Sequence, residues 1–184
     1  MEQTVQKAVQ TLKNGGTIIY PTETILGIGC LSLNSDSINQ VFKVKKRDPN
    51  RAMLVLVSDM SMIERYKKNI SPLEREMLLS KEPTTVILDH VNGFPTELTG
   101  INSSLAFRIT SNQLCLELIK SVDQPLVSTS ANLSGEKAAI NYLDLTDELI
   151  NKVDFVLKTK ISSTFQKPSR IVKIEQNKVK LIRK

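Results

Sequence analysis

Three basic side chains lie in places where a cation could contact a ligand. Lys45 and Arg47 stand at the end of a predicted helix, and Arg108 lies within the apolar strand predicted for residues 105–110. Cations at a helix end are ordinarily a solvated face that complements the helix dipole. An arginine in an apolar run is seldom fully buried without a partner. Arg108 therefore either pairs with an acid or faces a ligand anion.

Hydroxyl and amide side chains follow the short apolar run Leu126-Val127. The next residues, Ser128 to Gly135, read Ser-Thr-Ser-Ala-Asn-Leu-Ser-Gly, which predicts a buried strand that ends in a polar loop. Open α/β sheets bind ligands at strand ends, and hydroxyls with exposed backbone N–H groups suit phosphate or carboxylate. A serine-rich turn capping a helix fits this stretch equally well. Further neutral donors at predicted element ends are Thr22, Thr24, Thr85, Ser130 and Asn132.

Several common catalytic sites are excluded by the residues that the chain lacks. The single histidine, His90, disfavours a Ser-His-Asp or Cys-His hydrolase, and with Cys30 and Cys115 it cannot form a recognisable zinc site. Neither the P-loop motif nor the Gly-x-Gly-x-x-Gly fingerprint is present. The remaining cations and neutral donors indicate a site that binds and orients anions without a protein nucleophile.

The elements that must position these residues alternate between strand and helix. Strands are predicted at residues 17–20, 53–57, 86–88, 105–110, 126–128 and 153–157, with a closing hairpin of 169–174 and 179–182. Helices are predicted at 5–12, from 34 or 35 until Asp48-Pro49, from 71 to 79, from 111 or 112 to 119, and briefly at 142–150. Residues 25–30 read as a bulged core strand, and 161–167 as a polar loop. Because the hairpin must be antiparallel, this order predicts an α/β fold with a mixed sheet.

Composition narrows the class of protein further. A length of 184 residues favours one domain, 1–184, and the charge of +6 attracts polyanions without distinguishing nucleotide from RNA or from plain solubility. An aromatic content of 4% disfavours a single-strand binder built on stacked aromatic side chains. Without a signal-like N-terminus or an apolar run of about 20 residues, we expect a soluble cytoplasmic protein with no membrane partner.

A series of short motifs follows in order along nearly the whole chain. They are residues 15–24, Gly27, Gly29, 45–47, 83–85, 98–100, 104–110, 125–135, 167–169 and Arg183. Taken together, these ordered motifs resemble the threonylcarbamoyl-adenylate synthase family, the YrdC-like domain proteins. The Lys-x-Arg of Lys45 and Arg47 and the Ser-x-Asn of Ser130 and Asn132 are the pair typical of its synthases. Leu26 stands where the family usually has an aromatic residue, and Lys81-Glu82-Pro83 replaces its usual Pro-Gly-Pro.

The resemblance implies an open, twisted, mixed parallel and antiparallel sheet flanked by helices, in a single YrdC-like domain. It implies that threonine, bicarbonate or CO₂, and ATP become threonylcarbamoyl-AMP and diphosphate, for a separate transferase that modifies tRNA next to the anticodon. Magnesium is expected with ATP. Lys45 and Arg47 are the expected catalytic residues. The expected ATP-binding residues are these two with Thr85, Ser130, Asn132, Ser169 and Arg183, and the expected threonine-binding residues are Thr22, Arg108 and Thr129.

Two other functions stay open at this point. A non-catalytic module that grips double-stranded RNA or tRNA with the same basic face would explain the positive charge, although not an arginine inside a strand. A paralogue that makes another acyl-adenylate would share the fold.

Overall fold

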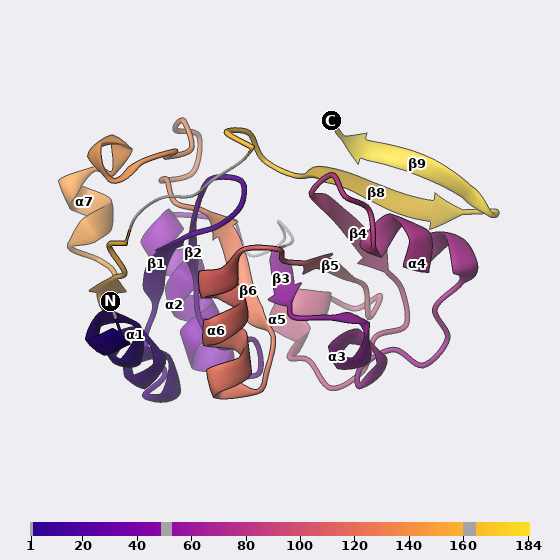
Figure 1. Ribbon diagram of the computed structural model, residues 1–184, viewed down its shortest axis with the longest axis horizontal. Coiled ribbons are helices and arrows are strands. Elements are labelled where there is room, and N and C mark those ends of the chain that lie inside the picture. Colours follow the sequence, from indigo (N-terminus) through magenta and orange to yellow (C-terminus); the bar gives the residue numbers. More distant parts are fainter. Residues whose placement is uncertain (1, 49–52, 160–164) are drawn as a thin grey trace.

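The computed structural model describes residues 2–48, 53–159 and 165–184 and contains a nine-stranded sheet (Figure 1). Its strand order is β7-β1-β2-β6-β3-β5-β4-β8-β9. The strands are β1 (Ile18–Pro21), β2 (Leu26–Gly29), β3 (Leu54–Val57), β4 (Thr84–Leu88), β5 (Leu105–Ile109), β6 (Leu126–Ser130), β7 (Phe155–Val156), β8 (Arg170–Glu175) and β9 (Lys178–Arg183). Met53–Val57 was predicted as a central strand, and β3 is the fifth of the nine.

The sheet is mixed, which confirms the predicted class. Pairs β1–β7, β3–β5 and β4–β8 are parallel. Pairs β1–β2, β2–β6, β3–β6, β4–β5 and β8–β9 are antiparallel. The predicted closing hairpin is β8–β9, and its turn residues Gln176 and Asn177 both have positive φ, as the tight turn of such a hairpin requires.

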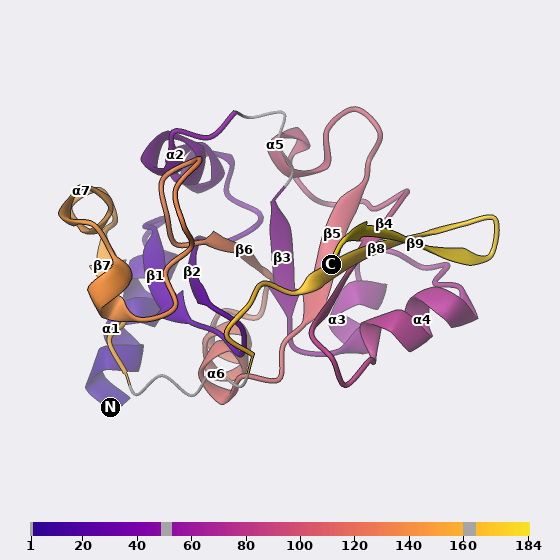
Figure 2. The ribbon, with the colours of Figure 1, turned by 90° about the horizontal axis from the view of Figure 1, so that it is seen from above.

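Helices cover both faces of this sheet. Figure 2 shows α1, α6, α3 and α4 on one side of the strands and α2 and α5 on the other. The helices are α1 (Glu2–Lys13), α2 (Ser35–Lys45), α3 (Met60–Glu64), α4 (Pro72–Leu78), α5 (Thr96–Thr99), α6 (Gln113–Val122) and α7 (Asp147–Ile150), with the 3₁₀ turn η1 (Tyr142–Asp144). Among these helices, none is long and apolar enough to cross a bilayer.

Helix α2 ends where the basic residues of the candidate site begin. Asn34 caps its start, because its side chain accepts a hydrogen bond from the backbone N–H of Ser37. Ile38, Val41 and Phe42 face the core, as predicted. The helix stops at Lys46, which takes the left-handed conformation. The break predicted at Pro49 lies outside the described residues.

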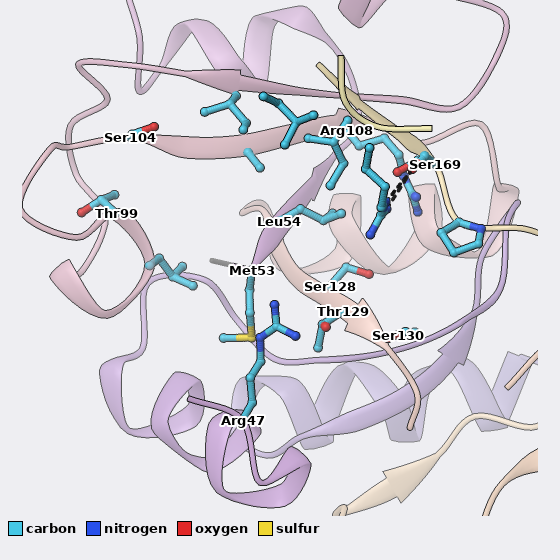
Figure 3. A pocket seen from close by; sticks show the side chains of 18 of the residues that line it. Arg47, Met53, Leu54, Thr99, Ser104, Arg108, Ser128, Thr129, Ser130 and Ser169 are labelled. Atoms are coloured by element: carbon cyan, nitrogen blue, oxygen red, sulfur yellow. Dashed lines mark hydrogen bonds between the residues drawn. The ribbon is translucent and has the colours of Figure 1, made fainter. Parts of the chain in front are cut away.

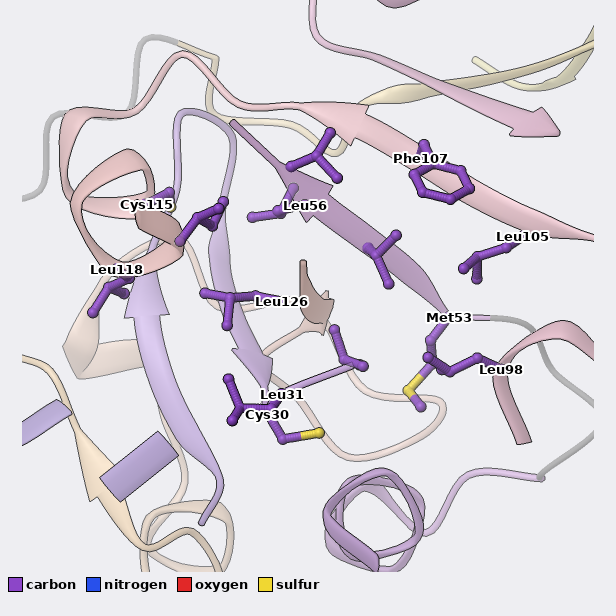
Figure 4. Close-up of a cluster of buried hydrophobic side chains, with 14 of the residues drawn as sticks. Cys30, Leu31, Met53, Leu56, Leu98, Leu105, Phe107, Cys115, Leu118 and Leu126 are labelled. Atoms are coloured by element: carbon purple, nitrogen blue, oxygen red, sulfur yellow. The ribbon is translucent and has the colours of Figure 1, made fainter. Parts of the chain in front are cut away.

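The main core lies between the sheet and its helices. Figure 4 shows Phe107 and Leu105 of β5, Leu56 of β3 and Leu126 of β6 in one cluster of buried side chains. Helix α6 adds Cys115 and Leu118 to this cluster, in agreement with its predicted apolar face. The burial of these apolar side chains holds the strands of the sheet in place.

Three elements differ from the prediction. Residues 142–150 form η1 and α7 as two separate turns, because Asn141 and Thr146 each cap a new start. Helices α3 and α5 were not predicted, since five and four residues are too few to show an apolar period.

Of the loop predicted at 161–167, residues 161–164 lie outside the described residues.

Gly29 stands where two backbone segments approach closely. An ideal Cβ at this position would lie 1.6 Å from the carbonyl oxygen of Val127. Gly29→Ala is therefore expected to lower the free energy of unfolding by about 3 kcal/mol or more, because backbone must move to make room. Denaturant titration measures this change. The matched control is Gly27→Ala, whose Cβ would meet side-chain atoms and no backbone, the nearest being the Ser128 hydroxyl at 3.1 Å. Equal losses in the two variants would contradict the prediction.

Candidate functional site

A cavity of about 1050 Å³ lies over the middle of the sheet, and a row of paired residues forms its floor. Leu54 of β3 pairs with Ser128 of β6 on one side and with Ala106 of β5 on the other. Ala106 in turn pairs with Ile87 of β4. All four line the cavity. Because paired residues of neighbouring strands point to the same face, the floor is apolar except at Ser128.

Three arginines line this cavity: Arg47, which follows α2, Arg108 of β5 and Arg183 of β9. Figure 3 shows Arg47 and Arg108 entering from opposite sides. Burial and the positive charges of Arg108 and Arg47 lower the pKa of Arg183, so the three guanidinium groups sense one another. Among the described lining residues, Glu97 carries the only carboxylate. The cavity is therefore built to attract anions.

Arg108 both pairs with an acid and lines the cavity, so the two alternatives that its strand position left open are both present. It is 4% exposed, and its Nε lies 3.1 Å from Oε1 of Glu23, an ion pair without hydrogen-bond alignment at Nε. Its Nη1 donates to Oγ1 of Thr24 at 3.4 Å. Glu23 and Thr24 come from the β1–β2 connection, which wraps around the guanidinium group.

Hydroxyl groups from three segments lie beside these arginines in the lining. Thr22 and Thr24 are hydrogen-bonded to each other at 2.9 Å on the β1–β2 connection. Ser169, just before β8, shares a 2.8 Å hydrogen bond with Thr85 of β4. The end of β6 adds the side chains labelled in Figure 3, which are Ser128, Thr129 and Ser130. These neutral donors can bind anionic oxygens without adding charge.

Lys45 lies beneath the loop after β6 and not among the residues that line the cavity. Its ammonium group donates to the backbone carbonyl of Ser130, to the carbonyl of Asn132 at 2.7 Å and to Oδ1 of Asn132 at 3.4 Å. The residue is 1% exposed. In this arrangement Lys45 holds the loop together, and its charge acts on the cavity from behind.

The backbone N–H groups of residues 131–134 in the loop after β6 are bonded within the protein, so they are not the exposed donors for an anion that the prediction allowed. The N–H of Ala131 donates to Leu26 O at 2.9 Å, and that of Asn132 donates to Ser130 O at 3.0 Å. The N–H of Leu133 donates to Oε2 of Glu136 at 3.4 Å. The N–H of Ser134 donates to the carbonyl of Lys45 at 2.9 Å. These contacts fold the loop back on α2 and leave hydroxyl side chains as the donors at the strand end.

The ten predicted site residues fall into two groups. Those that line the cavity are Thr22, Arg47, Arg108, Thr129, Ser130, Ser169 and Arg183. Lys45, Thr85 and Asn132 lie behind them. Thr85 is fully buried and bonds Ser169, while the Asn132 amide donates to the carbonyls of Leu133 and Glu136 at 2.8 Å.

Other lining residues were not predicted as site residues. Ser128 precedes the predicted threonine-binding Thr129 on the same strand, and Thr99 and Ser104 lie on either side of a turn that leads from α5 into β5. Their stretches, 98–100 and 104–110, were among the motifs that carried the resemblance. Met53 and Leu54 also line the cavity. Their sequence pattern predicted a buried strand but gave no indication of a binding site.

The buried ammonium group of Lys45 gives a test of its environment. Burial, aided by the charge of Arg47, lowers the pKa of Lys45 from its ordinary 10.5 to about 8. Between about pH 8 and pH 10.5 the folded state has released a proton that the unfolded state still holds. The free-energy cost of burying Lys45 therefore falls, and the stability of the folded state rises, as the pH increases through this range. The free energy of unfolding of the wild type should therefore rise relative to that of Lys45→Met between about pH 7 and about pH 10. Thermal unfolding of both proteins measures it, and a difference that is constant with pH would contradict the assigned environment.

Comparison with known proteins agrees with this fold and these motifs. Residues 10–184 match the family of Sua5, YciO and YrdC, which is described as telomere recombination. A relative in Hahella chejuensis named threonylcarbamoyl-AMP synthase is 33% identical over 172 residues, 91% of each chain. The P. abyssi Sua5 solved in complex with L-threonine superimposes with a TM-score of 0.87 at 23% identity, and E. coli YciO with 0.83 at 19%.

The coverage differs between these proteins. The alignment to Sua5 includes 100% of this chain and 54% of that one, so the chain spans about half the length of Sua5. With YciO the corresponding shares are 100% and 90%. At these identities the solved structures establish the fold alone, whereas the family match covers nearly the whole sequence. The chain belongs to the family of Sua5, YciO and YrdC, whose curated relatives are enzymes named threonylcarbamoyl-AMP synthase.

Proposed function

We propose that this protein makes L-threonylcarbamoyl-AMP and diphosphate from L-threonine, bicarbonate or CO₂, and ATP. The observation that carries the proposal is the convergence of Arg47, Arg108 and Arg183 on one cavity whose other polar lining is mostly hydroxyl groups. The names of the curated relatives support the reaction. A cavity of about 1050 Å³ is at the upper end for ligand pockets, as two substrates bound together require.

The charges of the reactants explain why three cations are needed. N-carboxythreonine is a dianion, and one of its carbamate oxygens must attack the α-phosphorus of ATP as the bond to the diphosphate breaks. Two unit charges 4 Å apart repel by about 4 kcal/mol at an effective dielectric near 20. Positive groups aimed at this contact offset the repulsion and stabilise the charge that develops during transfer.

We assign each lining group to one part of the reactants. Arg47 and Arg183, with Ser130 and Ser169, would bind the phosphates, and Thr85 would orient Ser169 through their 2.8 Å hydrogen bond. Arg108 would hold the threonine carboxylate, because a guanidinium fork binds a carboxylate bidentately, and Thr22 and Thr129 would bind the rest of threonine. The apolar floor suits the adenine ring. Holding the reactants in line contributes up to roughly 7 to 11 kcal/mol without a protein nucleophile.

Magnesium would enter with ATP. Among the described residues no group of three His, Cys, Asp or Glu side chains could hold a metal ion. Mg²⁺ commonly binds to substrate phosphates, several waters and one or two carboxylates. Glu97, the carboxylate of the described lining, is the side chain that could reach it. The ion would neutralise phosphate charge there.

The product would be consumed in the cytoplasm by a separate transferase that modifies the adenosine next to the anticodon of tRNA. This step rests on the family resemblance and on the relatives' name. A mixed acyl-phosphate anhydride such as threonylcarbamoyl-AMP is an activated acyl donor, so a group-transfer reaction is the chemistry that must follow. Direct contact with tRNA would use the same positive charge that attracts nucleotides.

One assay tests the proposal. Diphosphate release is measured with ATP, threonine and bicarbonate together, and then with each omitted in turn. We expect release only from the complete mixture, and mass spectrometry should identify threonylcarbamoyl-AMP. Release with another amino acid in place of threonine would indicate a paralogue of different specificity. Binding of duplex RNA with no release would overturn the proposal in favour of an RNA-binding module.

A further inference from the structure

We propose that Glu23 is a positioning residue that presents Arg108 to the carboxylate of the amino-acid substrate. This inference rests on the proposed function, which assigns that carboxylate to Arg108. It concerns a side chain that was not among the predicted site residues and that does not itself line the cavity.

Glu23 is held in place from two directions. Its Oε1 lies 3.1 Å from Nε of Arg108, and its Oε2 accepts a hydrogen bond from Oγ1 of Thr110 at 2.8 Å. The same Thr110 oxygen accepts from the backbone N–H of Asn112 at 3.2 Å. The Glu23 carbonyl also accepts from the N–H of Phe165 at 3.1 Å. The carboxylate is thus fixed between the β1–β2 connection and the end of β5.

The ion pair is buried, so its orientation matters. The side chains of Arg108 and Glu23 are 5% and 6% exposed. A buried charge without a partner is strongly disfavoured, and Glu23 is the carboxylate that neutralises Arg108 when no substrate is bound. This ion pair with Glu23 allows Arg108 to lie in β5, in the middle of the sheet, with its guanidinium group at the edge of the apolar cavity floor.

The position of Glu23 also decides which side of the guanidinium group remains for a ligand. Glu23 occupies the Nε side, and Thr24 accepts from Nη1 at a long 3.4 Å. Among the described residues, no other hydrogen bond from the Arg108 side chain is present. The two Nη atoms at the tip are therefore left to bind a carboxylate end-on, since the side-on fork that includes Nε is taken. Glu23 acts by holding Arg108 in the orientation that allows this end-on contact. If the Arg108 side chain turned toward solvent, the contact with the substrate carboxylate would be lost.

Charge removal at constant shape tests the inference. Glu23→Gln should raise the KM for threonine by about 10-fold or more and leave the KM for ATP within about 2-fold, because one charge-assisted contact is lost. Arg108→Met should raise the KM for threonine at least as much. If Glu23 acts only through Arg108, adding Glu23→Gln to Arg108→Met should change the KM for threonine by less than about 2-fold.

A stability measurement and a second variant separate a loss of positioning from a loss of folding. Thermal unfolding of each variant checks the fold. Thr110→Val is a milder change that can be used if Glu23→Gln does not fold. The Thr110→Val variant keeps both charges and removes the hydroxyl that donates to Oε2 of Glu23 and accepts from the N–H of Asn112. It should raise the KM for threonine selectively by a smaller factor. An unchanged KM for threonine in these variants, equal rises for threonine and ATP, or full additivity in the Arg108→Met background would overturn the positioning role. If the wild type itself shows no threonine-dependent diphosphate release, the proposed function fails instead.

Discussion

Arg47→Ala is expected to slow diphosphate release by at least about 100-fold while the protein keeps its fold, because one pre-positioned cation at the developing charge is worth roughly 100 to 1000-fold. Arg47 lies just past the end of α2 and points into the cavity toward the floor (Figure 3). It is only half-buried, so its removal opens no core cavity. Single-turnover measurements with saturating ATP and threonine report the chemical step directly.

Lys43→Ala is the matched control for this prediction. Lys43 lies in the last turn of the same helix, is exposed and does not line the cavity. It therefore removes one positive charge from the same end of α2 without removing a group that faces the substrates. We expect its rate to stay within about 2-fold of the wild type, since solvent and salt screen an exposed charge that does not face the site. Equal losses in the two variants would show that net charge, not the position of Arg47, supports the reaction.

The convergence of Arg47 and Arg108 was predictable from the sequence, and its reason is visible in the strand order. Lys45, expected with them, does not line the cavity, and Arg183, which does, was indicated only by the family resemblance. Arg108 was recognised because arginine is expensive to bury within an apolar strand, and Arg47 because it ends a helix next to a central strand. In the structure β5 is the parallel neighbour of β3, the strand that follows α2. The order of elements therefore brings the end of α2 and the strand arginine to the same face of the sheet.

What sequence reasoning could not supply is the direction of groups that long-range contacts orient. Lys45 and Asn132 have the residue types of ligand-binding groups. The Lys45 ammonium group, however, donates to the Asn132 side chain and to the carbonyls of Ser130 and Asn132, which lie 85 and 87 residues away in the chain. Glu23 is an unremarkable acid in a Thr-Glu-Thr stretch until β5 places Arg108 beside it. A local pattern indicates which side chains can bind anions, whereas the tertiary fold decides which of them face the ligand.

The loop after β6 illustrates the same limit. A run of small polar residues after a strand predicted free N–H groups for an anion. Instead the N–H groups of residues 131–134 are used within the protein, two of them by the distant Leu26 and Lys45 carbonyls. Such pairing follows from the rule that backbone donors seldom stay unpaired when buried, but the choice of partner depends on the whole fold.

Lys45→Met should abolish most diphosphate release, by about 100-fold or more, and unlike Arg47→Ala it should also destabilise the protein. Methionine keeps the length of the side chain but cannot donate to the carbonyls of Ser130 and Asn132. A buried acceptor that loses its partner costs about 1 to 3 kcal/mol. The neutral side chain relieves some of the cost of burying an ammonium group, so the net loss of stability is expected to be smaller than two such costs.

Hydrogen exchange separates an anchor of the loop from a direct phosphate ligand. In Lys45→Met the amides of Ala131 and Ser134, which donate to Leu26 and to the Lys45 carbonyl in the wild type, should exchange faster, because the loop can open without global unfolding. In Arg47→Ala the same amides should keep their protection. If Lys45→Met lost activity with wild-type protection and wild-type stability, Lys45 would act on the phosphates alone. The combined loss of rate, protection and stability is what its position beneath the loop requires, because the carbonyls it holds belong to the segment that presents Ser130 to the substrates.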